Sequence, residues 1–252
     1  MALLLSAGVA HAGPLPVGWT TNGDAGSNTT ADGVVTLAPG FSSYQWLSTA
    51  GAPSGGGNMP NSLTGQETNG TTVKTPTFTV AANDKLKFYF NYITSDGAQY
   101  TEYAWAGLFN GTSSFNSYLF TARTTTSGNT VPGFGLPGLG AGVTLSPSST
   151  AIIPGGPVFS PLGGSSGRCW STGCGYTGWI EMDYMFTTAG IYSLGFGVTN
   201  ALDTQYDSAF AVAGVTINDV PIDDNNVPEP GSLALLGLGL AGIAGLCRRK
   251  SA

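Results

Sequence analysis

The chain contains a single histidine, His11, and it lies within the first 12 residues. Charged residues make up only 9% of the sequence, against about 25% in ordinary soluble domains. Without a histidine beyond residue 12, the main part of the chain cannot form a Ser-His-Asp or Cys-His catalytic set. A histidine-based zinc site is excluded for the same reason.

The few charges that are present are mostly negative. Residues 13–230 contain five Lys and Arg residues and all 14 Asp and Glu residues, which gives this part a net charge of −9. Such a balance opposes binding to nucleic acid or to anionic lipid. It is compatible with neutral glycans or with divalent cations as ligands.

Cysteine is also scarce, with three in the chain. Cys169 and Cys174 are close in the sequence, whereas Cys247 lies near the C-terminus. The close spacing predicts a disulfide between Cys169 and Cys174 if the protein reaches an oxidising compartment. A metal site would need further Cys or His partners, and residues 13–230 have none.

The first 12 residues predict export. They are apolar and end in Ala10-His11-Ala12, the small-x-small pattern of a signal-peptidase site. We therefore expect residues 1–12 to be a signal peptide, removed by signal peptidase to leave Gly13 as the mature N-terminus.

The C-terminus carries a second candidate targeting signal. Residues 231–247 are uncharged and apolar, and in a helix they would span about 25 Å, the lower limit for crossing a bilayer. The basic residues that follow would stay on the cytoplasmic side. The run is flanked by Val227, Pro228, Glu229 and Pro230 before it, and by Arg248, Arg249 and Lys250 after it.

In this order and position, the Pro-Glu-Pro motif, the apolar run and the basic cluster resemble the PEP-CTERM sorting signal of Gram-negative bacteria. The resemblance implies cleavage by an exosortase-type membrane protease after transient anchoring in the inner membrane. It also implies a final place at the cell surface or in the extracellular matrix, alongside exopolysaccharide in a biofilm. An ordinary single-pass anchor without processing is the alternative. Two internal segments, TARTTTSGNTVPGFG and GCGYTGW, resemble segments of uncharacterised PEP-CTERM proteins.

Alternation of apolar and polar residues predicts an all-β domain over residues 13–218, a single β-sandwich or jelly roll. A change of parity at Ala213-Gly214 predicts a β-bulge in the last strand. Residues 219–226 would form an acidic linker, and residues 227–252 the sorting signal with its transmembrane helix. The expected strands are 86–92, 180–186, 192–198 and 209–218, with shorter candidates at 33–37, 76–80, 103–109 and 117–121.

Residues 124–176 interrupt this pattern with a long Gly- and Pro-rich insertion. Structureless connections of this length are unusual inside a compact domain. The insertion is either a surface lobe whose aromatic residues contact a ligand, or a cover over a sheet edge or an end of the core. The aromatic candidates in and beside it are Phe134, Phe159, Trp170, Tyr176 and Trp179.

Two loops carry candidate metal ligands. Asp96 and Glu102 follow one strong strand, and Asn200, Asp203 and Asp207 precede the last one. If the fold brings the loops together, Asp96, Glu102, Asp203 and Asp207 would offer the oxygen ligands that calcium prefers. The alternative is that these residues only form turns. We expect no cofactor, with calcium as the one option that these residues leave open.

We expect a non-enzymatic, exported protein with a structural or adhesive role. A glycan-binding module is the first alternative. Most aromatic residues alternate along the expected strands and are core candidates, and Trp46, Trp105 and Trp170 are the ones to test as an aromatic platform. A glycan hydrolase that uses two carboxylates is the second alternative.

Overall fold

The computed structural model describes residues 13–61 and 64–222. The chain divides into two compact units, Met1–Ile222 and Asp223–Ala252. The predicted signal peptide, sorting signal and transmembrane helix, and residues 223–226 of the predicted linker, lie outside the described residues. In the described ranges 13–61 and 64–222, no helix is long and apolar enough to cross a membrane.

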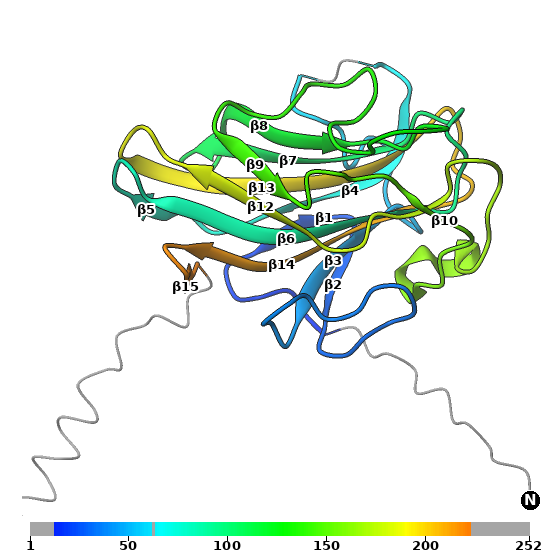
Figure 1. Ribbon diagram of the computed structural model, residues 1–252, viewed down its shortest axis with the longest axis horizontal. Helices are drawn as coiled ribbons and strands as arrows, with labels where there is room; N and C mark the ends of the chain where they lie inside the picture. The colour runs from blue at the N-terminus through cyan, green and yellow to red at the C-terminus, as the bar shows by residue number, and fades with distance from the viewer. Residues whose placement is uncertain (1–12, 62–63, 223–252) are drawn as a thin grey trace, which may run out of the picture. The chain divides into compact units, whose positions relative to one another are not determined.

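The described part of the chain folds into two antiparallel sheets, which confirms the predicted all-β sandwich. The six-stranded sheet has the order β1-β4-β13-β7-β8, with β5 also paired to β13. In Figure 1, β8, β7 and β13 of this sheet lie above β6, β14, β3 and β2 of the second sheet. The strands are β1 (Thr20–Asn22), β4 (Glu67–Lys74), β5 (Phe78–Val80), β7 (Tyr103–Asn110), β8 (Ser114–Ala122) and β13 (Gly190–Ala201).

The nine-stranded sheet has the order β10-β11-β6-β14-β3-β2, with β12, β9 and β15 attached beside this path. Strand β6 is central, since it pairs with β14 on one side and with β12 and β11 on the other. The strands are β2 (Asp24–Asn28), β3 (Tyr44–Ser48), β6 (Lys85–Thr94), β9 (Val143–Ser146), β10 (Ile153–Pro154), β11 (Gly175–Tyr176), β12 (Ile180–Met185), β14 (Ser208–Ile217) and β15 (Val220–Pro221).

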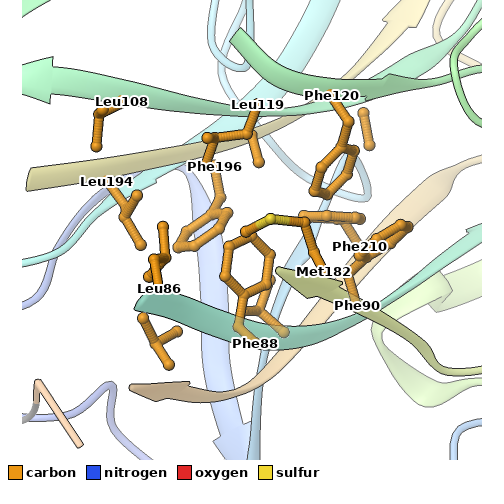
Figure 2. Packing of buried hydrophobic residues seen from close by; sticks show 14 of the residues in the cluster. Leu86, Phe88, Phe90, Leu108, Leu119, Phe120, Met182, Leu194, Phe196 and Phe210 are labelled. Carbon is orange, nitrogen blue, oxygen red and sulfur yellow. The ribbon is translucent and has the colours of Figure 1, made fainter. Parts of the chain in front are cut away.

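The main core lies between the sheets, where the inward residues of the alternating strands meet (Figure 2). Phe90 stacks on Phe120 with ring centroids 4.1 Å apart, so β6 and β8 are joined across the layers. Phe88 meets Phe196 of β13 edge-to-face at 5.4 Å. These contacts bury large aromatic areas, which contribute most to the stability of such a core.

The predicted β-bulge is present in β14. The register with β6 shifts between Ala213 and Thr216, and Gly214 has a φ of +64°. A Cβ atom at this position would lie 2.2 Å from the ring of Phe41, so glycine is required by both the backbone angle and the space. After the bulge, Val215 is buried and the alternation continues.

A second apolar cluster covers the outer face of the nine-stranded sheet. The residues that pack onto this face are Val35, and Phe159 and Leu162 at the short 3-10 helix η1 (Ser160–Ser165). It packs on Tyr44 and Trp46 of β3 and on the alanines of β14. The small outward side chains of Ala209, Ala211 and Ala213 leave room for this layer.

Residues 124–176 are therefore partly a cover, as one of the two predictions had it. Phe159 is fully buried, Trp179 packs edge-on against Tyr44 at 5.8 Å, and β9 extends the sheet beyond β12. Other aromatic residues face solvent, since Phe134 is 75% exposed and Trp170 is 50% exposed. The covering role is therefore confirmed for part of the insertion, and a ligand-contacting role for its exposed aromatic residues stays a prediction.

Two local predictions were wrong. Residues 33–37 form no strand, because Gly33 adopts a φ of +55° and the chain turns back through an Asp32–Val35 bridge. The β domain does not end at residue 218, because β15 pairs with Thr216 and Ile217. Asn218 and Asp219 both have positive φ, as a two-residue hairpin turn requires, so the first residues of the expected linker belong to the sheet.

Candidate functional site

Three loops meet at one end of the sandwich, which we call the loop end: residues 95–102, 168–174 and 202–207. They are tied by backbone hydrogen bonds. The N–H of Ser95 donates to the carbonyl oxygen of Asp207 at 3.2 Å, and the N–H of Trp170 donates to that of Ser95 at 2.9 Å. A further bond joins the N–H of Ala98 to the carbonyl oxygen of Thr172 at 2.8 Å. Loops that are distant in sequence therefore act as one surface.

The predicted disulfide is present in the second loop and joins Cys169 to Cys174. The Cys174 side is buried, with 2% exposure, and anchors the loop to the body. Trp170 follows Cys169 directly, so the cross-link closes the loop that presents this indole to solvent.

Trp170 is the centre of an aromatic platform. Its ring lies 5.1 Å from that of Tyr206 at an angle of 49°, and 6.5 Å from that of Tyr100 at 78°. The guanidinium of Arg168 lies over the Tyr206 ring at 5.8 Å. Leu202 and Tyr206 both have positive φ, which is uncommon for such residues. The backbone of this loop is thus held in a costly conformation that places Tyr206 beside Trp170.

Below the platform lies a small pocket of about 80 Å³, lined by the three aromatic rings, Gln205 and the carboxyl groups of Asp96 and Asp203. It continues into a pocket of about 330 Å³ that shares Gln205 and Tyr206. That pocket in turn shares Gly164, Thr204 and Asp207 with a larger one of about 580 Å³. Together they form a groove that runs from Trp170 to Trp46, Asp24 and Asp32.

Glu102 lies inside the protein, behind the groove. Its Oε2 atom accepts a hydrogen bond from the Thr94 hydroxyl at 3.1 Å and another from the hydroxyl of Ser208. Burial, and after it the negative charge of Asp96, raise the pKa of Glu102 well above its usual value. Opposing hydrogen bonds from Ser208 and Thr94 favour the charged form.

Asp96 is 2% exposed and lies between Glu102 and the pocket. One of its oxygens accepts a hydrogen bond from the N–H of Gly97 at 2.7 Å. Burial raises the pKa of Asp96 to about 6, and the charge of Asp203 acts in the same direction. The Glu102 side chain acts in the opposite direction, and the N–H of Asp96 donates to the Thr94 hydroxyl that also binds Glu102.

The structure brings the four predicted carboxylates to the loop end. The pKa of Glu102 is raised by Asp96 and by Asp207, and that of Asp96 by Asp203. Asp207 is engaged on both oxygens, by the hydroxyls of Thr49 at 3.0 Å and Ser165 at 2.9 Å. Over residues 13–61 and 64–222, no three Asp, Glu, His or Cys side chains are grouped in a way that could hold a metal ion by themselves.

The predicted tryptophan platform is only partly correct. Trp170 is exposed as expected, and Trp46 lines the groove although its ring is 6% exposed. Trp105 is buried, because its ring lies on the glycines of β13 and its Nε1–H donates to the carbonyl oxygen of Gly57 at 2.7 Å. A side chain at Gly197 would place a Cβ atom 2.2 Å from that nitrogen, so β13 is shaped to receive the indole.

Several groove residues were not predicted. Tyr100 and Tyr206 sit in loops without periodicity, and Asp24 and Asp32 are far from the other acids in the sequence. The signal that could have found the tyrosines is their proximity to acids: Tyr100 lies between Asp96 and Glu102, and Tyr206 directly precedes Asp207.

A family model decides the identity of the C-terminal segment. The PEP-CTERM protein-sorting motif matches residues 226–250. This chain carries a PEP-CTERM sorting motif. The motif indicates an exported protein that is transiently held in a membrane and processed by an exosortase-type system. No curated protein matches this chain.

Solved structures resemble the body of this chain distantly. The K2 cleaved adhesin domain of Lys-gingipain is 12% identical, with a TM-score of 0.42, over 82% of this chain and 92% of that one. The K1 domain from Porphyromonas gingivalis W83 is 13% identical, with a TM-score of 0.37, over 83% and 96%. A CBM4 structure is 8% identical, with a TM-score of 0.33, over 79% and 93%. Similarities this distant carry no argument about ligands.

Proposed function

We propose that the β domain is an adhesive, non-enzymatic module that binds neutral polysaccharide along the loop-end groove. The protein would act at the cell surface or in the extracellular matrix of a Gram-negative bacterium after signal peptidase and an exosortase-type protease have processed it. Exopolysaccharide of a biofilm is the partner that this setting offers.

The observation that carries the proposal is the half-exposed Trp170 between Tyr100 and Tyr206, which lines the same pocket as Asp96 and Asp203. Aromatic rings offer broad apolar faces to the C–H faces of sugar rings, at low conformational cost. Carboxylates accept hydrogen bonds from sugar hydroxyls. The pocket thus joins the two kinds of contact that a pyranose needs.

The length and charge of the groove favour a chain of neutral sugars. The groove continues past Tyr206 and Asp207 to Trp46, so several sugar units can lie along it. Its lining includes Asp24 and Asp32 at the far end as well as the acids near the platform, with Arg168 as its one cation among the described lining residues. Such a lining repels sulfated or uronic-acid polymers.

The test is a glycan array with the full chain in mild detergent, followed by affinity measurements on the polysaccharides that bind. Trp170→Ala should weaken binding tenfold or more, since truncating a central aromatic contact typically costs about 2 kcal/mol. Phe134→Ala is the matched control, because Phe134 is an exposed aromatic residue outside the groove, and it should bind as the wild type does.

Three outcomes would overturn the proposal. One is the absence of binding to any glycan. Another is equal loss of binding in Trp170→Ala and Phe134→Ala. The third is release of shortened sugars from a bound polysaccharide, which would identify the domain as a carboxylate-based hydrolase.

A further inference from the structure

The interior of the sandwich changes character at the loop end. Strands β6, β7, β13 and β14 point apolar residues inward along most of their length, and Val198 and Phe210 are among the last of these. One further inward position on each strand is polar. These positions are Thr94, Glu102, Asn200 and Ser208, all at most 2% exposed.

Glu102 and Asn200 face each other across neighbouring strands. The ladder between β13 and β7 ends with the pair Thr199–Tyr103. Asn200 and Glu102 are the next residues along the two segments, which leaves them opposite each other just beyond the last pair. Val198 and Ala104, two residues from Asn200 and Glu102 respectively, belong to the inter-sheet core. Because side chains alternate along a strand, Asn200 and Glu102 point to the same interior space.

This space holds polar atoms that the protein does not satisfy. The Oε1 atom of Glu102 and both amide atoms of Asn200 are buried and have no hydrogen-bond partner in the described structure. Buried polar side-chain atoms nearly always have a partner, and each exception requires an explanation. Two such side chains facing each other point to a missing ligand.

The charges define the kind of ligand. Asp96 and Glu102 are linked through Thr94, whose hydroxyl accepts from the N–H of Asp96 and donates to Glu102. Asp203 lines the same pocket as Asp96. Carboxylates that are buried together repel one another unless a proton or a cation lies between them. All the free groups are oxygens except the amide nitrogen of Asn200, and oxygen ligands are those preferred by hard divalent cations.

We propose that Asp96, Glu102 and the amide oxygen of Asn200 bind one calcium ion, with Asp203 holding one of its water ligands on the solvent side. Asp207 stays outside the site, because hydroxyl groups occupy both of its oxygens. Water and backbone carbonyl oxygens complete the shell, as is common for calcium, whose geometry is flexible. Magnesium fits poorly because it requires strict octahedral geometry and loses its water reluctantly.

The ion would have a structural consequence for the groove. Asp96 and Asp203 belong to the two loops that present Tyr100 and Tyr206, on either side of Trp170. Calcium would therefore fix the platform, but its binding does not require that the platform binds glycans. The two proposals can fail separately, because calcium binding is measured without any sugar.

The experiment is calorimetric titration and thermal unfolding of the full chain in mild detergent, after treatment with a chelator. One calcium ion should bind per chain. At a hundredfold excess over Kd, calcium should lower the unfolding equilibrium constant about a hundredfold. Magnesium at the same concentration should produce a much smaller shift.

Glu102→Gln is the decisive variant, because it removes one charge and keeps an oxygen that can accept from Thr94 and Ser208. It should abolish the calcium response and should be at least as stable as the wild type in chelator. Asp219→Asn is the matched control, since Asp219 is exposed, and it should respond to calcium as the wild type does. If Glu102→Gln does not fold, Asp203→Asn at the rim should weaken calcium binding about tenfold.

Absence of calcium binding by the wild type at millimolar concentration would overturn the proposal. So would an equal response to magnesium, or an unchanged calcium affinity in Glu102→Gln or, where that variant does not fold, in Asp203→Asn.

Discussion

The middle of the sandwich and its loop end are formed around the same four strands, β6, β7, β13 and β14. They differ in the side chains that point into the interior. In the middle, inward positions hold Phe90, Phe196 and Phe210, whose rings pack against each other (Figure 2). Two to four residues further toward the loop end, the inward positions hold polar groups such as Asn200, part of them unsatisfied. Strands β6, β13 and β14 extend across the boundary, although the register between β13 and β4 shifts between Thr199 and Ala201.

The difference shows how one fold separates stability from binding. Apolar contacts in the middle need no ligand, because burial of their surface is favourable by itself. Buried carboxyl groups at the loop end are costly unless they are paired. Such a cost persists in a protein where the strained or unsatisfied groups serve a site.

The largest effect should follow from a change in the middle. Phe90→Ala removes the ring that stacks on Phe120 at 4.1 Å, and we expect a loss of about 3–5 kcal/mol in the free energy of unfolding. Denaturant titration measures this loss. Phe134→Ala should change stability by less than about 0.5 kcal/mol, because Phe134 is exposed. A small effect of Phe90→Ala would mean that the aromatic middle does not hold the sheets together.

The next largest effect should come from the cross-link at the loop end. The double change Cys169→Ser and Cys174→Ser should lower the free energy of unfolding by about 2 kcal/mol, since a short disulfide loop constrains the unfolded chain only modestly. The loss in free energy of glycan binding should exceed the loss in free energy of unfolding, because the loop presents Trp170. Affinity measurement below the melting temperature separates the two effects. Unchanged affinity would show that the disulfide does not shape the glycan-binding loop.

These two predictions rest on parts of the molecule that the sequence revealed to different degrees. Alternation located β6, β12, β13 and β14, because large apolar residues recur at every second position in each, although β13 and β14 are buried at nearly every position. The parity change located the bulge at Gly214. It did not locate β4, whose sequence ETNGTTVK is polar. That strand is buried through Thr71 and Val73 by its neighbours in space, which the sequence does not show.

The candidate site was predictable in composition but not in geometry. Glycine- and acid-rich loops predicted Asp96, Glu102, Asp203 and Asp207 as a group, and the fold does bring them together. The sequence could not show that Glu102 is fully buried or that Asp207 is satisfied by Thr49 and Ser165. These facts depend on contacts between residues more than 40 positions apart.

A smaller and directional effect should appear in the pH dependence of stability without calcium. Because the pKa of Asp96 is raised from 3.8 to about 6 in the folded state, the folded protein holds its proton more tightly than the unfolded one. This contribution to stability is therefore complete below pH 3.8 and is lost as the pH rises to about 6. The raised pKa of Glu102 extends the loss to higher pH.

The measurement is the melting temperature in chelator as a function of pH, for the wild type and for Glu102→Gln. The difference between the two should grow in favour of the variant as the pH rises above 4, and saturating calcium should reduce that growth. Parallel curves would show that the Asp96–Glu102 pair is not strained at neutral pH.

The smallest effect should occur at the end of β6 opposite the loop end. There Lys85 and Asp183 form an ion pair with an N–O distance of 2.8 Å, and the Lys85 side chain is 49% exposed. Lys85→Ala should change the free energy of unfolding by less than about 1 kcal/mol, as exposed ion pairs usually do. Calcium and glycan affinity should be unchanged, and a change in either would mean that this end also contributes to binding.

The central claim is that ligands meet this protein at its loop end, and amide hydrogen exchange tests it most directly. The full chain is compared with and without calcium, and with and without a polysaccharide that binds. The account predicts that protection increases in residues 95–102, 168–174 and 202–207, and stays constant in the turns at 81–84, 111–113 and 187–189 at the other end. Protection that increases at those turns, or nowhere, would contradict it.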